Sequence, residues 1–182
     1  MKWEEINTAL GQATYLMAII AHRFGYKFEA HKINLCGAMS TIQLKYPDKS
    51  NPQTNHKYEL YYGVPGVTEE RFNKALCMLL DCLRCLMQDV QLKMQNQLSA
   101  TDRASKSLLY KIEQDKIGGQ TIKYSSSETG KWTGSMKYFL TNLQWLVYMS
   151  QLKDMADQQT NVNMDDLNIT KDSTEEQKKA AR

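Results

Sequence analysis

Residues 131–145 read Lys131-Trp132-Thr133-Gly134-Ser135-Met136-Lys137-Tyr138-Phe139-Leu140-Thr141-Asn142-Leu143-Gln144-Trp145. Their large apolar side chains recur at steps of three and four, which is the period of an amphipathic α-helix. We therefore predict a helix over residues 131–152. Trp132 and Trp145 lie on faces about 140° apart at ~100° per residue. They cannot form one aromatic platform, so we expect at least one of them in the core.

Two earlier segments have the same helical period. Residues 3–24 form the first predicted helix, and Gly25 follows it at the position where glycine commonly ends helices. A second helix is predicted from Thr68, a residue type that caps helix starts, to Val90 or as far as Leu98. The chain thus has three main predicted helices.

Short strands are predicted between these helices, from alternation and from β-branched and aromatic residues. They cover residues 26–29, 33–36, 39–46 and 57–62 before the second helix, and 108–112 and 120–124 before the third. The connections are predicted at 47–53, 63–67, 99–107, 117–119 and 125–130. The order predicts an α+β fold of repeated units, each an antiparallel β-hairpin or sheet followed by an α-helix.

Composition favours one folded domain with a polar tail. The chain has 182 residues, of which 42% are hydrophobic and 24% charged. No apolar run approaches the ~20 residues that a membrane-spanning helix needs, and the N-terminus lacks a signal-peptide pattern, so a cytoplasmic location is expected. Residues 153–182 contain no aromatic residue. We predict a folded domain over residues 1–152 and a disordered tail over 153–182, with a frayed helix near 175–181.

Charge is unevenly divided between these two parts. Residues 153–182 hold five basic and seven acidic side chains, a net charge of −2, which leaves +5 on residues 1–152 of a chain whose total is +3. A mildly basic domain suits contact with an anionic membrane surface. The charge is too weak and scattered to indicate nucleic-acid binding.

The sequence contains no motif of a known catalytic site. Cys77, Cys82 and Cys85 cluster, but no second ligand pair has zinc-like spacing, so we expect them to act as small buried hydrophobic residues. For His22 and His31 a structural role is expected. We predict that the chain is not an enzyme and holds no cofactor and no metal; an enzyme that uses the cysteine cluster is the remote alternative.

Segments in matching order resemble the C-terminal evolutionarily conserved domain of the Beclin family (the autophagy protein six family). They are residues 3–12, 24–28, 72–76 with 80–82, and 131–133 with 136–145, and Tyr110-Lys111-Ile112 and Ile117-Gly118-Gly119 fall between the last two in order. The run from Leu140 to Trp145 is the most specific. The apolar residues that carry this likeness are expected in the core: Trp3, Phe72, Trp132, Phe139, Leu143 and Trp145.

The resemblance implies the β-α repeated autophagy-specific (BARA) fold. It also implies a non-catalytic adaptor and membrane-contact subunit of the class III phosphatidylinositol 3-kinase complex, in autophagosome formation and in endosomal and vacuolar sorting. The implied partners are the catalytic and scaffold subunits of that kinase and a coiled-coil accessory subunit. The implied location is cytoplasmic and peripheral, on the phagophore assembly site and endosomal membranes.

The chain departs from the family pattern in two places. We expect the BH3-like motif, the coiled coil and the strands of the first repeat to be absent, because the match begins at residue 3. The loop that contacts membranes in the family bears a cluster of large aromatic residues, whereas the matching residues 63–68 form a shorter loop with none. Its apolar residues are Val64, Pro65 and Val67; Tyr61 and Tyr62 lie next to it and either compensate for the loss or are ordinary strand residues. At ~25 cal/mol per Å² of apolar area, such a loss weakens insertion by several kcal/mol. A pure protein–protein interaction module is the alternative.

Overall fold

The computed structural model describes the backbone of residues 2–46, 50, 56–95 and 109–180, and the side chains of these residues up to 158. Within them the elements are α1 (Trp3–Arg23), β1 (His31–Asn34), the 3₁₀ helix η1 (Gly37–Met39), β2 (Thr41–Leu44), β3 (Tyr58–Glu59), α2 (Glu69–Met94), β4 (Ile112–Glu113), β5 (Lys116–Ile117), β6 (Gln120–Thr121) and α4 (Thr129–Ala180). The predicted α+β class is confirmed.

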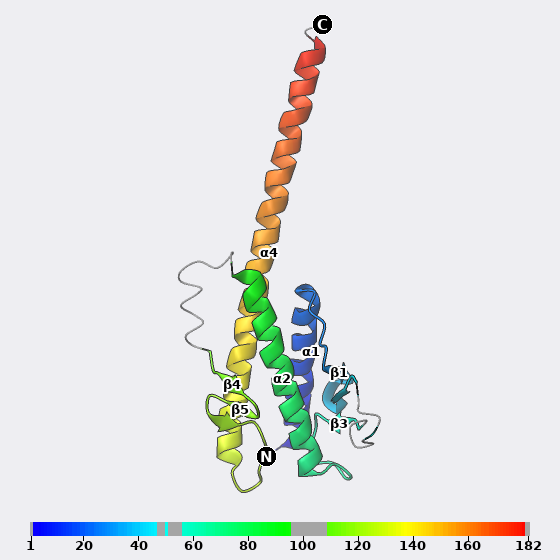
Figure 1. Cartoon of the computed structure of the whole chain (residues 1–182), viewed down its shortest axis with the longest axis vertical. Helices are drawn as coiled ribbons and strands as arrows, with labels where there is room; N and C mark the ends of the chain where they lie inside the picture. The colour runs from blue at the N-terminus through cyan, green and yellow to red at the C-terminus, as the bar shows by residue number, and fades with distance from the viewer. Residues whose placement is uncertain (1, 47–49, 51–55, 96–108, 181–182) are drawn as a thin grey trace.

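The three helices lie side by side and begin at the same end of the molecule (Figure 1). Glu69 and Glu70 occupy the first turn of α2, where acidic residues suit the helix dipole, and Thr68 accepts a hydrogen bond from the N–H of Arg71. None of the described helices is both long enough and apolar enough to cross a bilayer.

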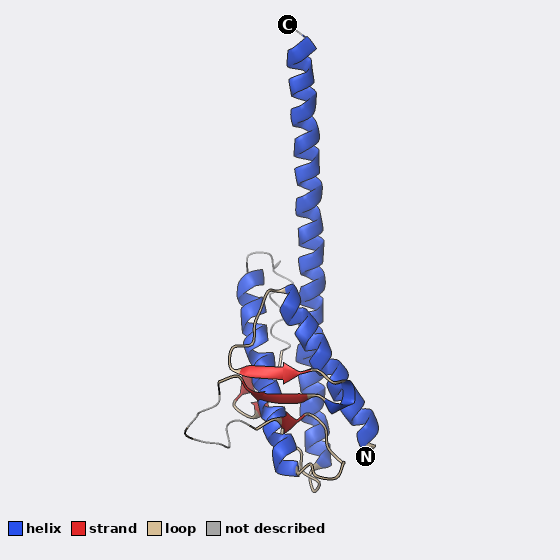
Figure 2. Ribbon diagram, turned by 90° about the vertical axis from the view of Figure 1, so that its right-hand side faces the viewer, coloured by secondary structure: helices blue, strands red, loops and turns tan. Residues whose placement is uncertain are grey.

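Two small antiparallel sheets accompany the helices. The first has the order β1-β2-β3 and packs on α2; the second has the order β4-β5-β6 and packs on α4. In the first sheet Ile33 pairs with Ile42, whose side chain is fully buried. The strands run across the helices (Figure 2). Each sheet therefore precedes in sequence the helix on which it packs, so the predicted strand-then-helix unit occurs twice.

Several predicted strands are shorter in the structure, and one is absent. Residues 26–29 form no strand, because the N–H of Tyr26 donates to the carbonyl of Ala21 at 2.8 Å and finishes the end of α1. Of the strands predicted over residues 57–62 and 120–124, the structure forms only the shorter strands β3 and β6. Their last residues, Tyr62 and Tyr124, bond to helix side chains instead of neighbouring strands.

The other predicted boundaries shift by a few residues or lie outside the described residues. The predicted strand over residues 39–46 contains the end of η1 and β2. Ile117 belongs to β5, so the turn is made by the two glycines that follow it. The loop at 99–107 and most of the loop at 47–53 lie outside the described residues.

Helix α4 continues to Ala180 and projects beyond the other helices (Figure 1). This differs from the disordered tail that we predicted for residues 153–182. An existing helix extends by one hydrogen bond per residue without a new nucleus, so a polar sequence can remain helical there. Arg23 of α1 supports the first part of the extension, with Asp154 at 2.9 Å. The boundary of the folded domain at residue 152 stays a prediction.

The core lies between the three helices and the two sheets. Its largest fully buried side chains come from every one of these layers: Phe72, Phe139, Met17, Ile20, Ile42, Leu60, Leu76, Leu79, Leu80, Leu83, Leu86 and Ile117. Both Trp132 and Trp145 are buried. The core therefore includes residues from all three described α-helices and from both sheets.

Candidate functional site

An aromatic cluster joins the starts of the three helices. The ring of Trp3 lies 4.8 Å from that of Tyr62 and 4.9 Å from that of Tyr124, both edge-on. Phe72 of α2 stacks on Tyr62 at 5.5 Å, and Trp132 of α4 meets Tyr124 at 5.4 Å. Such edge-to-face and stacked pairs stabilise beyond the area that they bury. The cluster thus fixes the segment that leads into the candidate loop.

Gly63, the first residue of this loop, lies against the cluster. Its φ is +80°, and a Cβ built there would lie 2.5 Å from Cγ of Trp3. Both the left-handed backbone and the close approach require glycine. The loop therefore starts from a rigid point.

Three asparagine side chains, one on each helix, each hold the backbone of a tyrosine. Asn7 of α1 accepts from the N–H of Tyr62 at 3.0 Å and donates to its carbonyl at 2.9 Å. Asn73 of α2 makes the same two bonds with Tyr124, at 2.6 and 2.9 Å. Each bond satisfies a backbone group that would otherwise lack a partner where the strand has ended.

The third asparagine holds the chain where it enters the second sheet. Asn142 of α4 accepts from the N–H of Tyr110 at 3.0 Å and donates to its carbonyl at 2.8 Å. We call Asn7, Asn73 and Asn142 the asparagine clamps. Sequence reasoning missed them and Tyr124. The available signal was an asparagine directly after a large apolar residue in both Ile6-Asn7 and Phe72-Asn73.

The candidate membrane-contact loop presents little apolar surface. Tyr61, Val64 and Val67 are half-buried, and Val67 packs against the core. The ring of Tyr62 is in the aromatic cluster, so only Pro65 of the five residues is exposed. The N–H of Val67 donates to the carbonyl of Val64 at 3.3 Å and closes the turn.

Arg71 ties the strand before the loop to the helix after it. Its guanidinium donates to the Glu59 carboxylate at 2.9 and 2.7 Å and to the Lys57 carbonyl at 2.6 Å. Burial alone would raise the pKa of Glu59, but the hydrogen bonds and charge of Arg71 outweigh it and hold that pKa below its usual value. The pair is therefore ionised at neutral pH and has a structural role.

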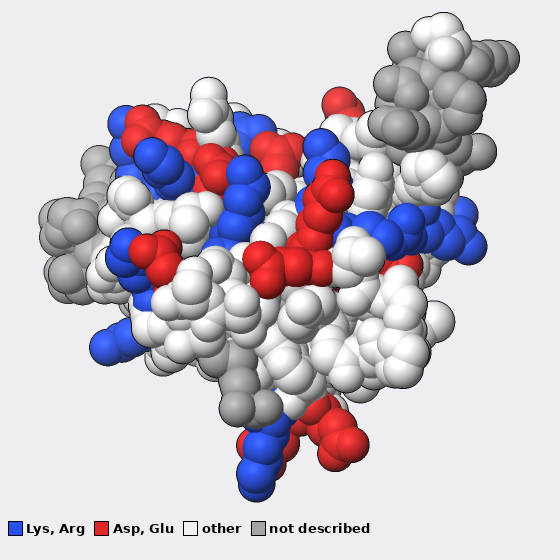
Figure 3. Space-filling view, turned by 90° about the horizontal axis from the view of Figure 1, so that it is seen from below, with Lys and Arg blue, Asp and Glu red and all other residues white. Residues whose placement is uncertain are grey.

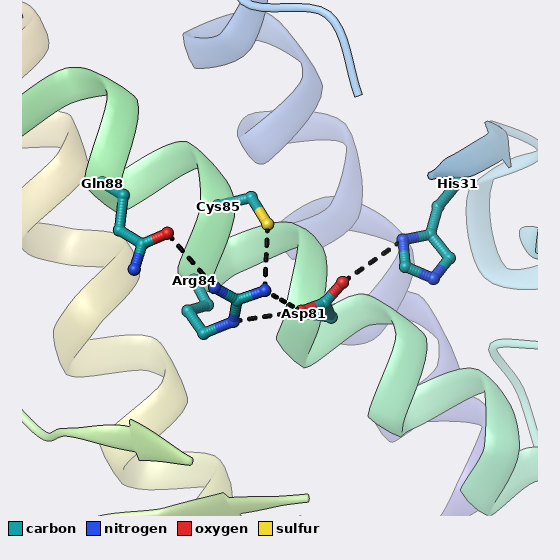
Figure 4. Close-up of polar contacts among 5 residues, drawn as sticks. All are labelled: His31, Asp81, Arg84, Cys85 and Gln88. Atoms are coloured by element: carbon teal, nitrogen blue, oxygen red, sulfur yellow. Dashed lines mark hydrogen bonds and ion pairs between the residues drawn. The ribbon is translucent and has the colours of Figure 1, made fainter. Parts of the chain in front are cut away.

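A second polar group links β1 to the middle of α2 (Figure 4). Nδ1 of His31 lies 3.7 Å from Asp81, and Nε of Arg84 donates to the same carboxylate at 3.0 Å. Arg84 also bonds Cys85 Sγ at 3.3 Å and Gln88 Oε1 at 3.1 Å. Burial lowers the pKa of His31, so its neutral form is favoured.

The cysteine cluster has no sign of an activated thiol. Cys82 is buried, while Cys77 and Cys85 are half-buried. Burial raises the pKa of all three thiols, so they stay protonated and unreactive near neutral pH. Within the residues that the structure describes, no three His, Cys, Asp or Glu side chains are grouped so as to hold a metal ion.

Charges of both signs are mixed on the face seen along the bundle from its helix starts (Figure 3). A broad part of that face carries neither sign. Over this view there is no field of one sign that would select an anionic or a cationic partner.

The residues of the family resemblance separate into two groups. Trp3, Phe72 and Trp132 meet in the aromatic cluster. Further along α4, the side chains of Phe139, Leu143 and Trp145 are in the core. Both groups hold the fold together, and neither contains a pair of groups suited to acid–base or nucleophilic chemistry.

Residues 1–152, which contain the cluster, the clamps and both sheets, match the sequence profile of the Apg6 BARA domain. The chain belongs to this family. The likeness to the Beclin family predicted from the sequence is thereby confirmed.

Named relatives agree with this family assignment. A Beclin-1-like protein of Arabidopsis thaliana is 34% identical over 149 residues, which are 81% of this chain and 27% of that protein. Vacuolar protein sorting-associated protein 30 of Kluyveromyces marxianus is 31% identical over 81% of this chain and 31% of its own length. Beclin-1-like protein B of Dictyostelium discoideum is 29% identical over 81% of this chain and 16% of its own length. The chain thus spans less than a third of each of these relatives.

Proposed function

We propose that this chain is a non-catalytic adaptor in autophagy and vacuolar protein sorting. In this proposal it works as an accessory subunit of a class III phosphatidylinositol 3-kinase complex, peripheral on phagophore and endosomal membranes. The family match over residues 1–152 carries the proposal. The names of the Beclin-1-like and vacuolar sorting relatives support the two processes.

The geometry supports an adaptor more than an enzyme. Charged side chains of the described residues form structural pairs, such as Arg71 with Glu59. The thiols of the cysteine cluster have raised pKa values, opposite to what a nucleophile needs. The function of such a domain then lies in its surfaces.

Deletion and rescue test the adaptor role. Loss of the chain from its native cells should reduce autophagic degradation and phosphatidylinositol 3-phosphate on internal membranes. Because Cys77 and Cys85 are the accessible thiols of the cluster, the chain with both changed to Ser should restore these activities fully. Failure of that variant to rescue, although it is folded, would favour the enzyme alternative.

Membrane contact through the loop is the finer part of the proposal. The place of the Tyr62 ring in the aromatic cluster and the half-buried valines favour the alternative, a protein–protein interaction module without direct lipid contact. Flotation with anionic liposomes separates the two, comparing the unaltered chain with Pro65→Asp at the exposed tip. Glu70→Gln, an exposed substitution on the neighbouring helix, is the control. Membrane contact requires flotation that Pro65→Asp reduces; no flotation of the unaltered chain identifies the protein-interaction module.

A further inference from the structure

Strand β1 is an edge of the first sheet, and one side of its backbone is open. The N–H of Lys45 donates to the carbonyl of Ala30 at 2.9 Å. In an antiparallel pair every second residue bonds to the neighbouring strand, so Lys32 also bonds toward β2. The N–H and carbonyl groups of His31 and Ile33 therefore point outward, and no described residue bonds to them. An open edge of this kind is a template for a further strand.

An open groove of about 800 Å³ runs along this edge. Ala18 and Ala21 of α1 line one side of it, and Leu35, which is 42% exposed, lines it just after β1. Tyr26 and Phe28 also line the groove, and their rings meet edge-on at 5.2 Å. The groove thus has apolar walls beside free backbone groups, and its volume suits several residues of an extended chain.

The next repeat has an equivalent groove, beside β4. Counted from the equivalent clamps Asn7 and Asn73, the same helix positions line both grooves: 18, 21 and 22 in α1, and 84, 87 and 88 in α2. Helix α2 carries its own sheet, and the groove beside β4 is open all the same. The opening beside β1 is therefore a feature of the repeat and does not depend on the chain that leads into α1.

The two grooves differ in charge. Both cations that line the groove beside β4, at positions 84 and 111, are paired with carboxylates. The groove beside β1 is lined by Lys27, Lys32 and Lys45 and by no Asp or Glu, and none of the three lysines has an ion pair with a described residue. Among the described residues, the groove beside β1 is therefore complementary to negative charge.

The lysines and the apolar side chains of the sheet lie on opposite faces. Ile33 pairs with Ile42, whose fully buried side chain faces the helices. Lys32 pairs with Gln43 on the other face, and Lys45, two residues further along β2, shares that face with Gln43. A strand added beside β1 would have to alternate in the same way.

We propose that the edge of β1 binds an extended acidic segment of a partner protein, which adds a strand to the first sheet. Alternate side chains of the segment would be acidic, facing Lys32 and Lys45, and apolar, facing α1. The β1 edge of a second copy is a poorer occupant, because pairing would bring the same lysines together. The proposal goes beyond the role in autophagy and does not rest on it.

Photo-cross-linking of the full chain in its native cells tests the proposal. Benzoylphenylalanine is placed at position 35, in the groove, and at position 92 as a control, since Leu92 is 72% exposed on α2 and outside the groove. Cross-linked peptides are identified by mass spectrometry. Position 35 should form an adduct with an acidic segment of another protein that alternates acidic and apolar residues, and position 92 should not form that adduct.

A charge reversal in the same cross-linking chain tests the lysines. Lys32→Glu should lower the yield at position 35 by about fivefold, because one attraction becomes a repulsion. Lys116→Glu, at an exposed strand position of the other sheet, should leave the yield unchanged. The proposal is overturned if the two variants give equal yields. It is also overturned if position 35 gives no adduct, or adducts only with lipid, with a second copy, with the same polypeptide or with segments that lack net negative charge.

Hydrogen exchange tests the strand pairing itself. A synthetic peptide of the cross-linked segment is added to the full chain, and amide exchange is followed by nuclear magnetic resonance. Exchange of the outward Ile33 N–H should slow by about tenfold or more at saturating peptide. Ile112, at the equivalent outward position of β4, is the control and should not change. Unchanged exchange at Ile33, or equal slowing at both positions, would overturn the pairing.

Discussion

At the scale of single residues, the asparagine clamps stabilise the fold through hydrogen bonds to the backbone of distant residues. Each satisfies two backbone groups of a tyrosine at a point where the strand has ended. A substitution that leaves either backbone group without a partner lowers stability by the desolvation free energy of that group. The clamps thus supply the hydrogen bonds that a neighbouring strand would supply to these backbone groups in a wider sheet.

Asn73→Ala should lower the free energy of unfolding by about 1–3 kcal/mol, because the backbone N–H and carbonyl of Tyr124 both lose their partner. Asn73→Asp keeps the hydrogen-bond acceptor but loses the donor, so its free energy of unfolding should lie between those of Asn73→Ala and the unaltered chain. Urea denaturation measures both. Lys74→Ala, at an exposed position one residue further, should change stability by less than about 0.5 kcal/mol. Equal effects at positions 73 and 74 would contradict the clamp.

Gly63→Ala should destabilise the chain more than Gly66→Ala does. Both glycines have positive φ, of 80° and 86°, which costs about 1–2 kcal/mol for alanine. Only at Gly63 does the new Cβ meet another group, at 2.5 Å from Trp3, for about 1–3 kcal/mol more. Thermal unfolding of the two variants checks this difference. Equal melting temperatures would show that Gly63 does not lie against the cluster as described.

At the scale of elements, the link between β3 and α2 has a pH dependence with a definite sign. The pKa of Glu59 in the folded chain is below its ordinary value of 4.5, so the pairing with Arg71 contributes fully above that value. The contribution is lost as pH falls through the lower folded-state pKa. Glu59→Gln should therefore be less stable than the unaltered chain at pH 7, by about 1 kcal/mol.

The difference in unfolding free energy between Glu59→Gln and the unaltered chain should shrink steadily as pH falls below 4.5. Denaturation curves from pH 7 to acid conditions measure it. Glu113→Gln is the control, because its pair with Lys111 is largely exposed. A difference for Glu59→Gln that grows toward low pH would refute the assigned ionisation.

The extension of α4 can be separated from the bundle. Removing residues 159–182 should leave the melting temperature within about 2 °C, because the last buried residue among the described side chains of α4, up to residue 158, is Ser150. Far-ultraviolet circular dichroism should show a loss of helical signal per molecule, since α4 is helical to Ala180. An unchanged helical signal would instead support the disordered tail predicted from the sequence.

At the scale of the whole molecule, sequence patterns predicted the helices better than the strands. The apolar period located α1, α2 and the buried part of α4, because helical periodicity is local. Strand ends at Tyr62 and Tyr124 depend on asparagines 55 and 51 positions away, which no local pattern contains.

The exposed side chains of the candidate loop could not be predicted from local sequence either. Its five residues were predicted from a resemblance, and their types alone suggested an apolar tip. The structure places the ring of Tyr62 in the aromatic cluster, against Phe72, and half-buries both valines, of which Val67 packs against the core. Which side chains a loop presents is decided by what the loop packs on.

The proposed role as an adaptor of a class III phosphatidylinositol 3-kinase complex requires that this chain binds other subunits of that complex. The most direct measurement is affinity purification of the intact chain from its native cells, followed by mass spectrometry of the proteins that it retains. If the chain has this role, the catalytic and scaffold subunits of that kinase should be recovered with it, in amounts comparable with the bait. A bait that is shown to be folded by its cooperative unfolding, and that recovers neither subunit, would contradict the claim.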